Sequence, residues 1–572
     1  MRANRFRLAL LAVLAVTIGC GTDTTYPPVV ASVQVSPGSD SLNALGLTRQ
    51  FTVVVKDQYG NPMAGKTVVW RSSQRLVATI DSATGVVAAV GNGVSMITAT
   101  VDFNTGIATL TVVQRAARLS FFTLIPRATV SYPLTPAIKV EVEDAGGTRV
   151  ANAQDAVTLG FGTNPTGATI GGTVVVNAVS GLATFSGLTI SNAGSGYTFQ
   201  ASGTGLVNVT SAPFSVNPDP GPFAQVSSGF AHTCGVTTAH VAYCWGNNDG
   251  GRLGDGTTTT RLNPTIVSGS LSFSEVSAGA NHTCGVAAGV VYCWGGNRFG
   301  QLGDGTTTDR LTPGAVPAPG GVTFASVTTG WYHTCAVTTG SAAYCWGYNL
   351  SGQLGDGTRS DHSSPTLVSG SVVFATVSAG SAHTCGRTAA SVAYCWGDNT
   401  NGQLGNGTTA PDSSPVLVAS PVGVTFAAVW AGSNHTCGRT AAGAAYCWGF
   451  NTGGQLGDGT TTDRSSPVLV AGGLTFTSLG PGGLHTCGAT TASPPTYCWG
   501  NNSYGQLGDG TTTAHSSPAV VPGFGISTLS GGGTHMCGTT SVGAVYCWGF
   551  NTTGQLGDGT AVNRSIPTHI VP

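Results

Sequence analysis

The sequence contains few charged residues. Only 8% of its 572 residues are Asp, Glu, Lys or Arg, against about 25% in typical soluble proteins. Lys and Glu, which favour exposed helices, occur three times each, so the chain is predicted to be rich in β-structure. The formal net charge is −1 and no basic block occurs. Because attraction between basic side chains and phosphates supplies most non-specific nucleic-acid affinity, DNA and RNA are not expected partners.

The N-terminal region lacks an apolar run long enough to span a membrane. Its apolar stretch, Leu8–Ile18, has 11 residues, whereas a spanning helix needs about 20. The stretch follows three arginines and precedes Gly19-Cys20, which is typical of a signal peptide over residues 1–20. Thr17-Ile18-Gly19-Cys20 resembles a bacterial lipobox, with Thr17 in place of the usual Leu, and the resemblance implies lipidation of Cys20.

An ordinary secretory signal is the alternative to lipidation. In either case the rest of the chain is expected outside the cytoplasm, where disulfides form. Lipidation would attach the chain to the bacterial outer membrane or the cell surface, and the lipid would then be its only contact with a membrane.

Glycine is abundant, with 86 residues, about twice its usual share. After a polar tether at residues 21–28, residues 29–114 alternate apolar and polar residues between turn signals. Val68–Ser73 and Val77–Asp81 resemble bacterial Ig-like group 2 domains, which serve mostly as rigid spacers, and Trp70 is expected in the core. Residues 115–217 resemble a second Ig-like domain less specifically. Three prolines make residues 218–222 a linker.

Residues 223–572 repeat one pattern seven times. Each copy has Tyr-Cys-Trp-Gly, a Gly-Gln-Leu-Gly-Asp-Gly-Thr tract, a Pro, a Phe-containing run and Gly-x-x-His-Thr-Cys. A period of about 50 residues is typical of propeller blades with four short strands. The chain is therefore predicted to be all-β, with two Ig-like β-sandwiches followed by a seven-bladed β-propeller. If a blade begins at Tyr-Cys-Trp-Gly, the seventh blade must combine both ends of the propeller segment.

The repeat carries a family resemblance. Its Gly-Gln-Leu-Gly-x-Gly tract, the following Pro and the Gly-x-x-His element resemble the regulator of chromosome condensation repeat, which also occurs in a bacterial propeller-type β-lactamase inhibitor. The departures are Arg252 for Gln, Asn406 for Asp, Met536 for Thr and Ile526 for Phe. The eukaryotic relatives imply guanine nucleotide exchange on a small GTPase, but a secretion signal argues against such a cytosolic partner.

Apart from Cys20, the 15 cysteines fall into seven pairs separated by 9 to 11 residues. Small residues between the two members of each pair predict a hairpin in which the cysteines face each other across the strands. Free thiols and a metal site built from His-Thr-Cys and the opposite Cys are the alternatives. The predicted disulfides are Cys234–Cys244, Cys284–Cys293, Cys335–Cys345, Cys385–Cys395, Cys437–Cys447, Cys487–Cys498 and Cys537–Cys547.

The repeated polar residues are predicted to be structural. Catalysis needs one asymmetric arrangement, whereas a scaffold needs the same hydrogen bond in every blade. The motif histidines are therefore expected to bind backbone groups, and the Asp of Asp-Gly-Thr to cap a turn, with calcium binding as the alternative. These residues are His232, His282, His333, His383, His435, His485 and His535, with Asp255, Asp304, Asp356, Asp458, Asp509 and Asp558.

A binding function is predicted where the copies differ. If the variable Gly-x-x-His loops share one rim, Phe230, Trp331 and Tyr332 form an aromatic patch there, flanked by Asn281 and Asn434. The sequence thus favours a monomeric, non-enzymatic surface protein without cofactor or metal, whose stalk presents a propeller to a protein or glycan. An enzyme, a hydrolase or lyase that uses the propeller channel, is the alternative. It would need a site that breaks the sevenfold pattern, and the sequence shows no such site.

Overall fold

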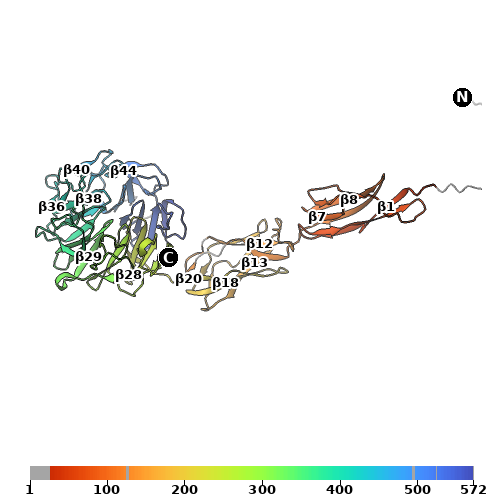
Figure 1. Cartoon of the computed structure of the whole chain (residues 1–572), viewed down its shortest axis with the longest axis horizontal. Helices are drawn as coiled ribbons and strands as arrows, with labels where there is room; N and C mark the ends of the chain where they lie inside the picture. The colour runs from red at the N-terminus through yellow and green to blue at the C-terminus, as the bar shows by residue number, and fades with distance from the viewer. Residues whose placement is uncertain (1–25, 124–127, 135, 492–495, 524, 571–572) are drawn as a thin grey trace, which may run out of the picture.

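The computed structural model describes residues 26–123, 128–134, 136–491, 496–523 and 525–570. The predicted lipidation site, Cys20, lies outside the described residues. Within them the chain forms strands and two short 3-10 turns, and no α-helix. None of the described segments is a helix of the length and apolarity that a membrane crossing requires. Figure 1 shows two small β-units in line, followed by a ring of sheets.

The first unit surrounds an apolar core that includes Phe51, Trp70 and Leu110, and Trp70 is only 4% exposed. Its strands are β1 (Val30–Ser36), β2 (Ser39–Leu42), β3 (Thr48–Gln50), β4 (Thr52–Asp57), β5 (Val69–Ser72), β6 (Ala78–Ile80), β7 (Val86–Ala89), β8 (Gly93–Val101) and β9 (Asn104–Val112). They form sheets in the orders β1-β4, β2-β9-β8-β5 and β3-β7-β6. Alternate residues of β8 and β9 are buried, as expected for strands that cover a core with one face.

The second unit has a separate core that includes Val140, Leu159 and Phe199. Its strands are β10 (Arg118–Phe121), β11 (Ala128–Thr129), β12 (Ile138–Glu143), β13 (Ala156–Thr163), β14 (Ile170–Gly171), β15 (Val175–Asn177), β16 (Leu182–Phe185), β17 (Thr189–Ile190), β18 (Gly194–Ser202), β19 (Val209–Thr210) and β20 (Phe214–Asn217). They form sheets in the orders β10-β12-β16, β11-β20-β18-β13-β15 and β14-β17, and β19 pairs with β18.

A buried carboxylate joins the two units. Asp144, which is 0% exposed, accepts hydrogen bonds from the Leu45 backbone N–H and the Gln114 side chain of the first unit, both at 2.9 Å. Burial alone would raise the pKa of Asp144, but these bonds, together with those from Gly146 and Thr148, lower it. The carboxylate is therefore charged at neutral pH and holds the junction of the two units together.

The propeller consists of seven four-stranded antiparallel sheets, each continuous in sequence. The inner strands are β21 (Phe223–Ser228), β25 (Glu275–Ala278), β29 (Phe324–Thr329), β33 (Thr376–Ala379), β37 (Ala428–Ala431), β41 (Phe476–Pro481) and β45 (Thr528–Gly531). The second strands are β22 (His232–Thr237), β26 (His282–Ala287), β30 (His333–Thr338), β34 (His383–Arg387), β38 (His435–Arg439), β42 (His485–Thr490) and β46 (His535–Thr539).

The third strands carry Tyr-Cys-Trp-Gly, and the outer strands contain the repeat proline. The third strands are β23 (Ala242–Gly246), β27 (Val290–Gly295), β31 (Ala343–Gly347), β35 (Ala393–Gly397), β39 (Ala445–Gly449), β43 (Thr496–Gly500) and β47 (Val545–Gly549). The outer strands are β24 (Arg261–Ile266), β28 (Arg310–Ala315), β32 (His362–Leu367), β36 (Asp412–Leu417), β40 (Arg464–Leu469), β44 (His515–Val520) and β48 (Arg564–His569).

The expected composite seventh blade is wrong. Tyr-Cys-Trp-Gly is the third strand of a blade and not its first, because the Phe-containing run supplies the inner strand and His-Thr-Cys the second strand of the same sheet. The first and last blades therefore pack against each other without sharing a sheet. Thr233 bonds to the Gln555 carbonyl and to His535, both at 2.8 Å, and Trp245 packs with Cys537 and Cys547 in one apolar cluster.

The second unit meets the propeller beside this seam. The Phe223 N–H, at the start of β21, donates a hydrogen bond to the Gly543 carbonyl of the last blade at 2.9 Å. The ring centroids of Tyr132, in the second unit, and His569, at the end of β48, lie 6.1 Å apart. Figure 1 shows the C-terminal end of the chain close to β20.

All seven predicted disulfides are confirmed, with Cα–Cα distances of 4.0 to 4.1 Å, slightly shorter than the roughly 4.5 Å expected. Each pair joins directly opposed residues of the second and third strands, such as Cys284 and Cys293. In that blade Ala288 and Gly289 form the predicted two-residue turn, with φ of 50° and 79°. Each bridge closes a loop of about ten residues, which stabilises the fold by roughly 2–3 kcal/mol.

Neighbouring blades are joined by a buried polar network. In the contact between the second and third blades, the Gln301 carbonyl accepts hydrogen bonds from the Thr334 hydroxyl at 2.8 Å and the Trp346 indole at 3.0 Å. The Thr334 oxygen lies 2.8 Å from His282 Nε2. Because that hydroxyl donates its one hydrogen to the carbonyl, His282 must be the donor to threonine. A Cβ on Gly303, which has a φ of +72°, would lie 2.5 Å from the same indole nitrogen, so glycine is required there.

The expected backbone partner of the histidines is therefore wrong: they bind a threonine side chain of the next blade. Six histidines have this partner, because the His-Thr of one strand faces the His-Thr of the next around the ring. The exception is His485, which faces Met536 in place of threonine. Its two ring nitrogens are buried without a hydrogen-bond partner among the described residues.

We predict that the propeller loses stability in mild acid. Burial lowers the pKa of His282, His333, His435 and His535 to about 3 and that of His383 to about 4, against 6.5 in the unfolded chain. Unfolding then takes up protons, so stability is complete above pH 6.5. It falls by about 1.4 kcal/mol per pH unit for each histidine as the pH decreases toward the folded values.

Thermal melts at pH 7.5, 5.5 and 4.5 test this expectation. Aspartates with lowered pKa values do not titrate in that range, and Glu275, whose pKa is raised to about 7, acts in the opposite direction as a single group against five histidines. The melting temperature of the propeller should decrease at each step. A melting temperature that stays constant or rises between pH 7.5 and 4.5 would contradict the neutral, buried histidines.

Candidate binding site on the propeller

The Gly-x-x-His loops connect the inner and second strands and meet around one end of the central channel. Their backbones are hydrogen-bonded to one another: the Phe230 N–H donates to the Gly279 carbonyl at 3.1 Å, and the Gly533 N–H donates to the Gly229 carbonyl at 3.2 Å. A Cβ on Gly229 would lie 2.3 Å from the Gly279 oxygen, so only glycine allows this approach. The result is a narrow mouth formed mainly by backbone.

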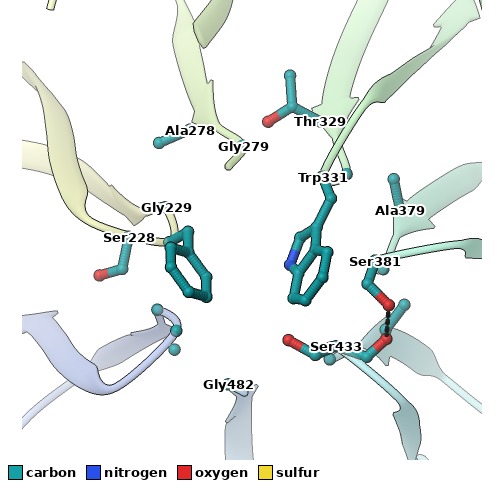
Figure 2. Close-up of a pocket in the computed structure, with 18 of the residues that line it drawn as sticks. Ser228, Gly229, Ala278, Gly279, Thr329, Trp331, Ala379, Ser381, Ser433 and Gly482 are labelled. Atoms are coloured by element: carbon teal, nitrogen blue, oxygen red, sulfur yellow. Dashed lines mark hydrogen bonds between the residues drawn. The ribbon is translucent and has the colours of Figure 1, made fainter. Parts of the chain in front are cut away.

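An aromatic pair covers this mouth. The ring centroids of Phe230 and Trp331 lie 5.6 Å apart with the ring planes 77° apart, an edge-to-face contact. Phe230 is 49% exposed and Trp331 is 37% exposed. Figure 2 shows Trp331 extending over the opening, within the ring of residues that includes Gly229, Gly279 and Gly482. The structure thus brings together two of the predicted binding residues.

The hollow under the pair is small. It has a volume of about 90 Å³ and is lined by glycine, alanine, serine, threonine and proline residues besides the aromatic pair. Figure 2 shows Ser381 bonded to Ser433, and the Ser381 hydroxyl donates to the Ser433 carbonyl. None of the described residues that line this hollow has a titratable side chain. The mouth is therefore lined by small and aromatic residues around a narrow hollow.

The other predicted residues lie apart from this pair. Tyr332 packs against Phe299 at 5.3 Å and Tyr348 at 6.4 Å between ring centroids, in a second aromatic cluster. Asn281 lines a separate pocket beside this cluster. Asn434 accepts a hydrogen bond from Ser381 at 2.8 Å. The five residues thus occupy several places around the loops and do not form one patch.

Sequence reasoning missed part of this aromatic surface. Phe299 and Tyr348 lie 4.8 Å apart, and Tyr504 and Phe550 lie 4.7 Å apart, in the loops that follow the third strands. These loops are bonded to the Gly-x-x-His loops, as in the bond from the Tyr348 N–H to the Tyr332 carbonyl at 2.9 Å. The signal was present, because the residues on either side of the repeat Asn also vary among the copies.

The repeated aspartates cap turns. Asp458 Oδ1 accepts bonds from the Thr460 N–H at 2.9 Å and its hydroxyl at 2.7 Å, and Oδ2 accepts bonds from Arg464. In the fourth blade, Asn406 replaces this aspartate, and Asp412 stands at the position that Arg464 occupies in the fifth blade. Both members of the ion pair are therefore replaced there. Over the described part of the chain, no three His, Cys, Asp or Glu side chains lie close enough together to hold a metal ion.

A larger cavity of about 520 Å³ lies along the inner strands of the channel, and its described lining includes one acidic side chain, Glu275, and one basic side chain, Arg387. In the first blade the Gln225 amide bridges to the next inner strand, donating to the Val276 carbonyl at 3.0 Å and accepting from its N–H at 3.2 Å. Glu275 occupies the same place in the second blade and accepts a bond from the Val327 N–H at 2.6 Å. Burial raises the pKa of Glu275 to about 7.

The comparisons with known proteins agree with this architecture, a closed propeller built from one repeated blade. The profile of the Regulator of chromosome condensation (RCC1) repeat matches residues 241–286, 288–337, 342–386, 392–438, 442–488, 496–538 and 542–572. A second profile of that repeat matches residues 223–252, 324–353, 374–403 and 426–455. The chain belongs to the RCC1 repeat family, as its sequence motifs predict.

Individual relatives show how far the similarity extends. The Ultraviolet-B receptor UVR8 of Arabidopsis thaliana is 32% identical over 255 residues, which are 43% of this chain and 57% of the receptor. The chain thus spans little more than half the length of that relative. The crystal structure of Kap60 bound to yeast RCC1 (Prp20) matches with a TM-score of 0.52 at 17% identity, over 61% of this chain and 85% of the other.

A second structure is that of Prp20p from Saccharomyces cerevisiae, described with its binding to Gsp1p and histones. It matches with a TM-score of 0.51 at 18% identity, over 61% of this chain and 88% of the other. At these identities the two structures show the common fold. The family relationship supports a binding or regulatory propeller.

We predict that Glu275→Gln stabilises the protein above pH 7. The pKa of Glu275 is about 7 in the folded protein and 4.5 in the unfolded chain, so unfolding between these pH values releases a proton. The stabilising contribution of Glu275 is therefore complete below pH 4.5. It is lost as the pH rises through 7, in the opposite direction to the histidines. Glutamine reproduces the bridge of Gln225 without a charge, and the gain should reach at most about 3 kcal/mol.

The free energy of unfolding of the wild type and of Glu275→Gln should be compared at pH 8 and pH 5. The variant should be more stable at pH 8, and the difference should become smaller at pH 5. Gln225→Glu is the matched control, which should introduce the same pH dependence into the first blade. A difference between wild type and Glu275→Gln that does not change with pH would contradict the raised pKa.

Proposed function

We propose that this chain is a non-enzymatic, cell-surface binding and adhesion protein. In this proposal, a lipid on Cys20 anchors the chain outside the cytoplasm, on the bacterial outer membrane or cell surface. Two Ig-like domains, residues 29–114 and 115–217, form a stalk and hold the propeller of residues 223–572 away from the membrane. The propeller then recognises a protein partner as a monomer, through the face that carries the variable loops.

The exposed pair of Phe230 and Trp331 carries the proposal. Large aromatic side chains dominate the binding energy of protein interfaces, and tryptophan is among the commonest of these anchors. Both rings rest on a backbone ring that is fixed by hydrogen bonds between blades, so little conformational entropy is lost when a partner binds. Leu484, another variable loop residue, is 39% exposed, which adds to the apolar surface of this face.

The known relatives favour a protein as the partner. The yeast propellers are described with Kap60, Gsp1p and histones, all of which are proteins. A shared fold does not transfer a partner, so the proposed partner is defined by the aromatic pair and not by those names. Because this proposal places the chain outside the cytoplasm, it does not include exchange activity on a cytosolic GTPase.

An enzyme is the weaker alternative. The channel mouth has a hollow of about 90 Å³ with no titratable lining among the described residues. In the larger cavity along the inner strands, the titratable groups are Glu275, which is engaged with the Val327 backbone, and Arg387, whose guanidinium stays protonated. A single carboxyl group that supports a neighbouring strand offers no acid–base pair for hydrolysis or elimination.

The stalk is supported by the junction at Asp144. Its carboxylate accepts bonds from the first unit through Leu45 and Gln114, and bonds from its own loop through Gly146 and Thr148. Two bonds from the first unit to a buried charge, which its own loop holds in place with two more, restrict bending between the units. Such restriction suits a spacer that must project a binding domain.

Trp331→Ala should abolish capture of the partner. The full-length protein, its Trp331→Ala variant and a Tyr59→Ala control are used as baits for cross-linked surface proteins of candidate target cells. Tyr59 is 60% exposed on the first unit, so its removal controls for general loss of surface aromatics. Loss of a central aromatic anchor should weaken binding by about 2 kcal/mol or more, roughly 30-fold.

Proteins captured by the wild type and by Tyr59→Ala, but not by Trp331→Ala, are the expected result. Affinities measured with a purified partner should show the same order. Equal capture by Trp331→Ala and wild type would remove the aromatic pair from the proposed interface.

Cys20→Ser should remove the lipid anchor. In bacteria that express the full chain, wild-type protein should incorporate a clickable fatty acid and fractionate with membranes, because the acyl chains supply the membrane affinity. The Cys20→Ser variant should incorporate none. Unlabelled wild-type protein in the soluble extracytoplasmic fraction would support an ordinary secretory signal instead.

A further inference from the structure

A pocket of about 380 Å³ opens among the loops that follow the third strands of the first two blades, beside Tyr332 of the third blade. It lies beside a position at which this copy of the repeat has glycine. Gly296 immediately precedes the repeat Asn297, and in the other six blades this position carries a larger residue. These residues are Asn247, Tyr348, Asp398, Phe450, Asn501 and Phe550.

The backbone does not require glycine at position 296. Its φ is outside the left-handed region, and a Cβ there would make contacts of 3.3 Å with the Asn281 carbonyl oxygen and 3.4 Å with its Cβ. The Gly296 N–H bonds to the Asn281 carbonyl at 2.8 Å, as the Tyr348 N–H bonds to the Tyr332 carbonyl at 2.9 Å in the next blade. The second blade thus uses the same loop geometry and leaves open the space that a side chain occupies elsewhere. We call it the Gly296 pocket.

The walls of the Gly296 pocket combine aromatic rings with charged groups of both signs. Phe299 and Tyr332 line the pocket and contact each other at 5.3 Å between ring centroids. The Arg298 guanidinium lies 5.5 Å from the centre of the Phe299 ring. Asp249 and Asp309 supply carboxylates, and Asp309 is oriented by the Asn297 N–H at 2.7 Å.

A buried arginine also lines the pocket. Arg252 is 8% exposed and stands where the other six copies have glutamine. Its Nε donates to the Asp249 carbonyl and its Nη1 to the Ala280 carbonyl, both at 2.9 Å. A guanidinium has five N–H donors, so these two bonds leave others for a ligand oxygen. The first two blades therefore depart from the repeat at both Arg252 and Gly296, in the same pocket.

We propose that the Gly296 pocket binds a neutral saccharide. The apolar C–H face of a sugar ring packs on an aromatic side chain, and its hydroxyl groups donate to carboxylates and accept from guanidinium and amide groups. Phe299 and Tyr332 supply the rings, and Asp309 and Arg252 supply acceptors and donors. The volume accommodates about two hexose rings, within the usual range of ligand sites.

The balance of charge selects the ligand class. Two carboxylates and two guanidinium groups cancel, so the pocket gives no net attraction to an anion or a cation. The phosphates of a nucleotide would face Asp249 and Asp309, and a lysine-rich peptide would face Arg252 and Arg298. The saccharide site adds a second ligand class to the proposed function and does not depend on the protein partner at the aromatic pair.

A glycan array with the full-length protein tests this proposal, because it presents neutral, acidic and sulfated glycans together. We expect binding to neutral glycans, followed by a measurable affinity for a mono- or disaccharide from the set. Gly296→Tyr should reduce that affinity at least about tenfold, because the new ring occupies the pocket as Tyr348 occupies the same position in the third blade. Gly296→Ala adds only a Cβ and should retain most of the binding.

Two further variants keep the outcomes separate. Tyr332→Ala should also weaken saccharide binding. It replaces Gly296→Tyr as the test if melting curves show that Gly296→Tyr is unstable. Trp331→Ala should leave saccharide binding unchanged, although it should abolish capture of a protein partner. The proposal is overturned if the wild type binds no neutral glycan, if it binds only acidic glycans, or if Gly296→Tyr folds and binds as the wild type does.

Discussion

The propeller depends on one backbone carbonyl per blade. In five of the seven contacts, the carbonyl of the residue at the Gln position of Gly-Gln-Leu-Gly accepts a threonine hydroxyl and a tryptophan indole from the next blade, as Gln301 does from Thr334 and Trp346. Gln506 accepts only from Trp548, and Gln555 only from Thr233. In this contact, the Gly-Gln-Leu-Gly loop of one blade packs against the buried second and third strands of the next blade. It also explains the repeat as a whole, since His, Thr, Trp and the second glycine of the tract all belong to the same buried contact.

The departures from the repeat show which parts of this contact matter. Arg252 replaces glutamine without loss of the contact, because the backbone carbonyl and not the side chain accepts the hydrogen bonds. Thr283 still donates to the Arg252 carbonyl at 2.8 Å. Asn406 is accommodated because its cationic partner is replaced as well. Met536 is different: it removes the hydroxyl that His485 would otherwise bind and leaves apolar packing in its place. The contact between the last two blades therefore has less polar character than the others.

Much of this architecture could be predicted because it depends on short-range regularities. The disulfides follow from the spacing of Cys284 and Cys293 around a two-residue turn, and the blade number follows from counting the repeats. The strand at which a blade begins could not be predicted, since every starting point in a repeated sequence gives the same pattern. The partner of each histidine also could not be predicted, because Thr334 is some fifty residues from His282 and is brought to it only by ring closure.

The proposed binding face was predicted only in part. Variation among the copies identified Phe230 and Trp331, whose side chains meet across the channel mouth. It could not show that Tyr332, the next residue in the chain, turns toward Phe299 and Tyr348 instead. The Gly296 pocket arises from a side chain that is missing, and a search for chemically active residues passes over such a position.

The seam between the first and last blades is also where the rest of the chain joins the ring. The second unit leads into the ring through Phe223, at the start of an inner strand that is bonded to Gly543 of the last blade, and Tyr132 of the second unit contacts His569 of the same blade. Force transmitted through the second unit would therefore act beside the contact in which Thr233 is held by Gln555 and His535. Because each disulfide closes a hairpin within one blade, none of them crosses this seam, and noncovalent contacts hold it closed.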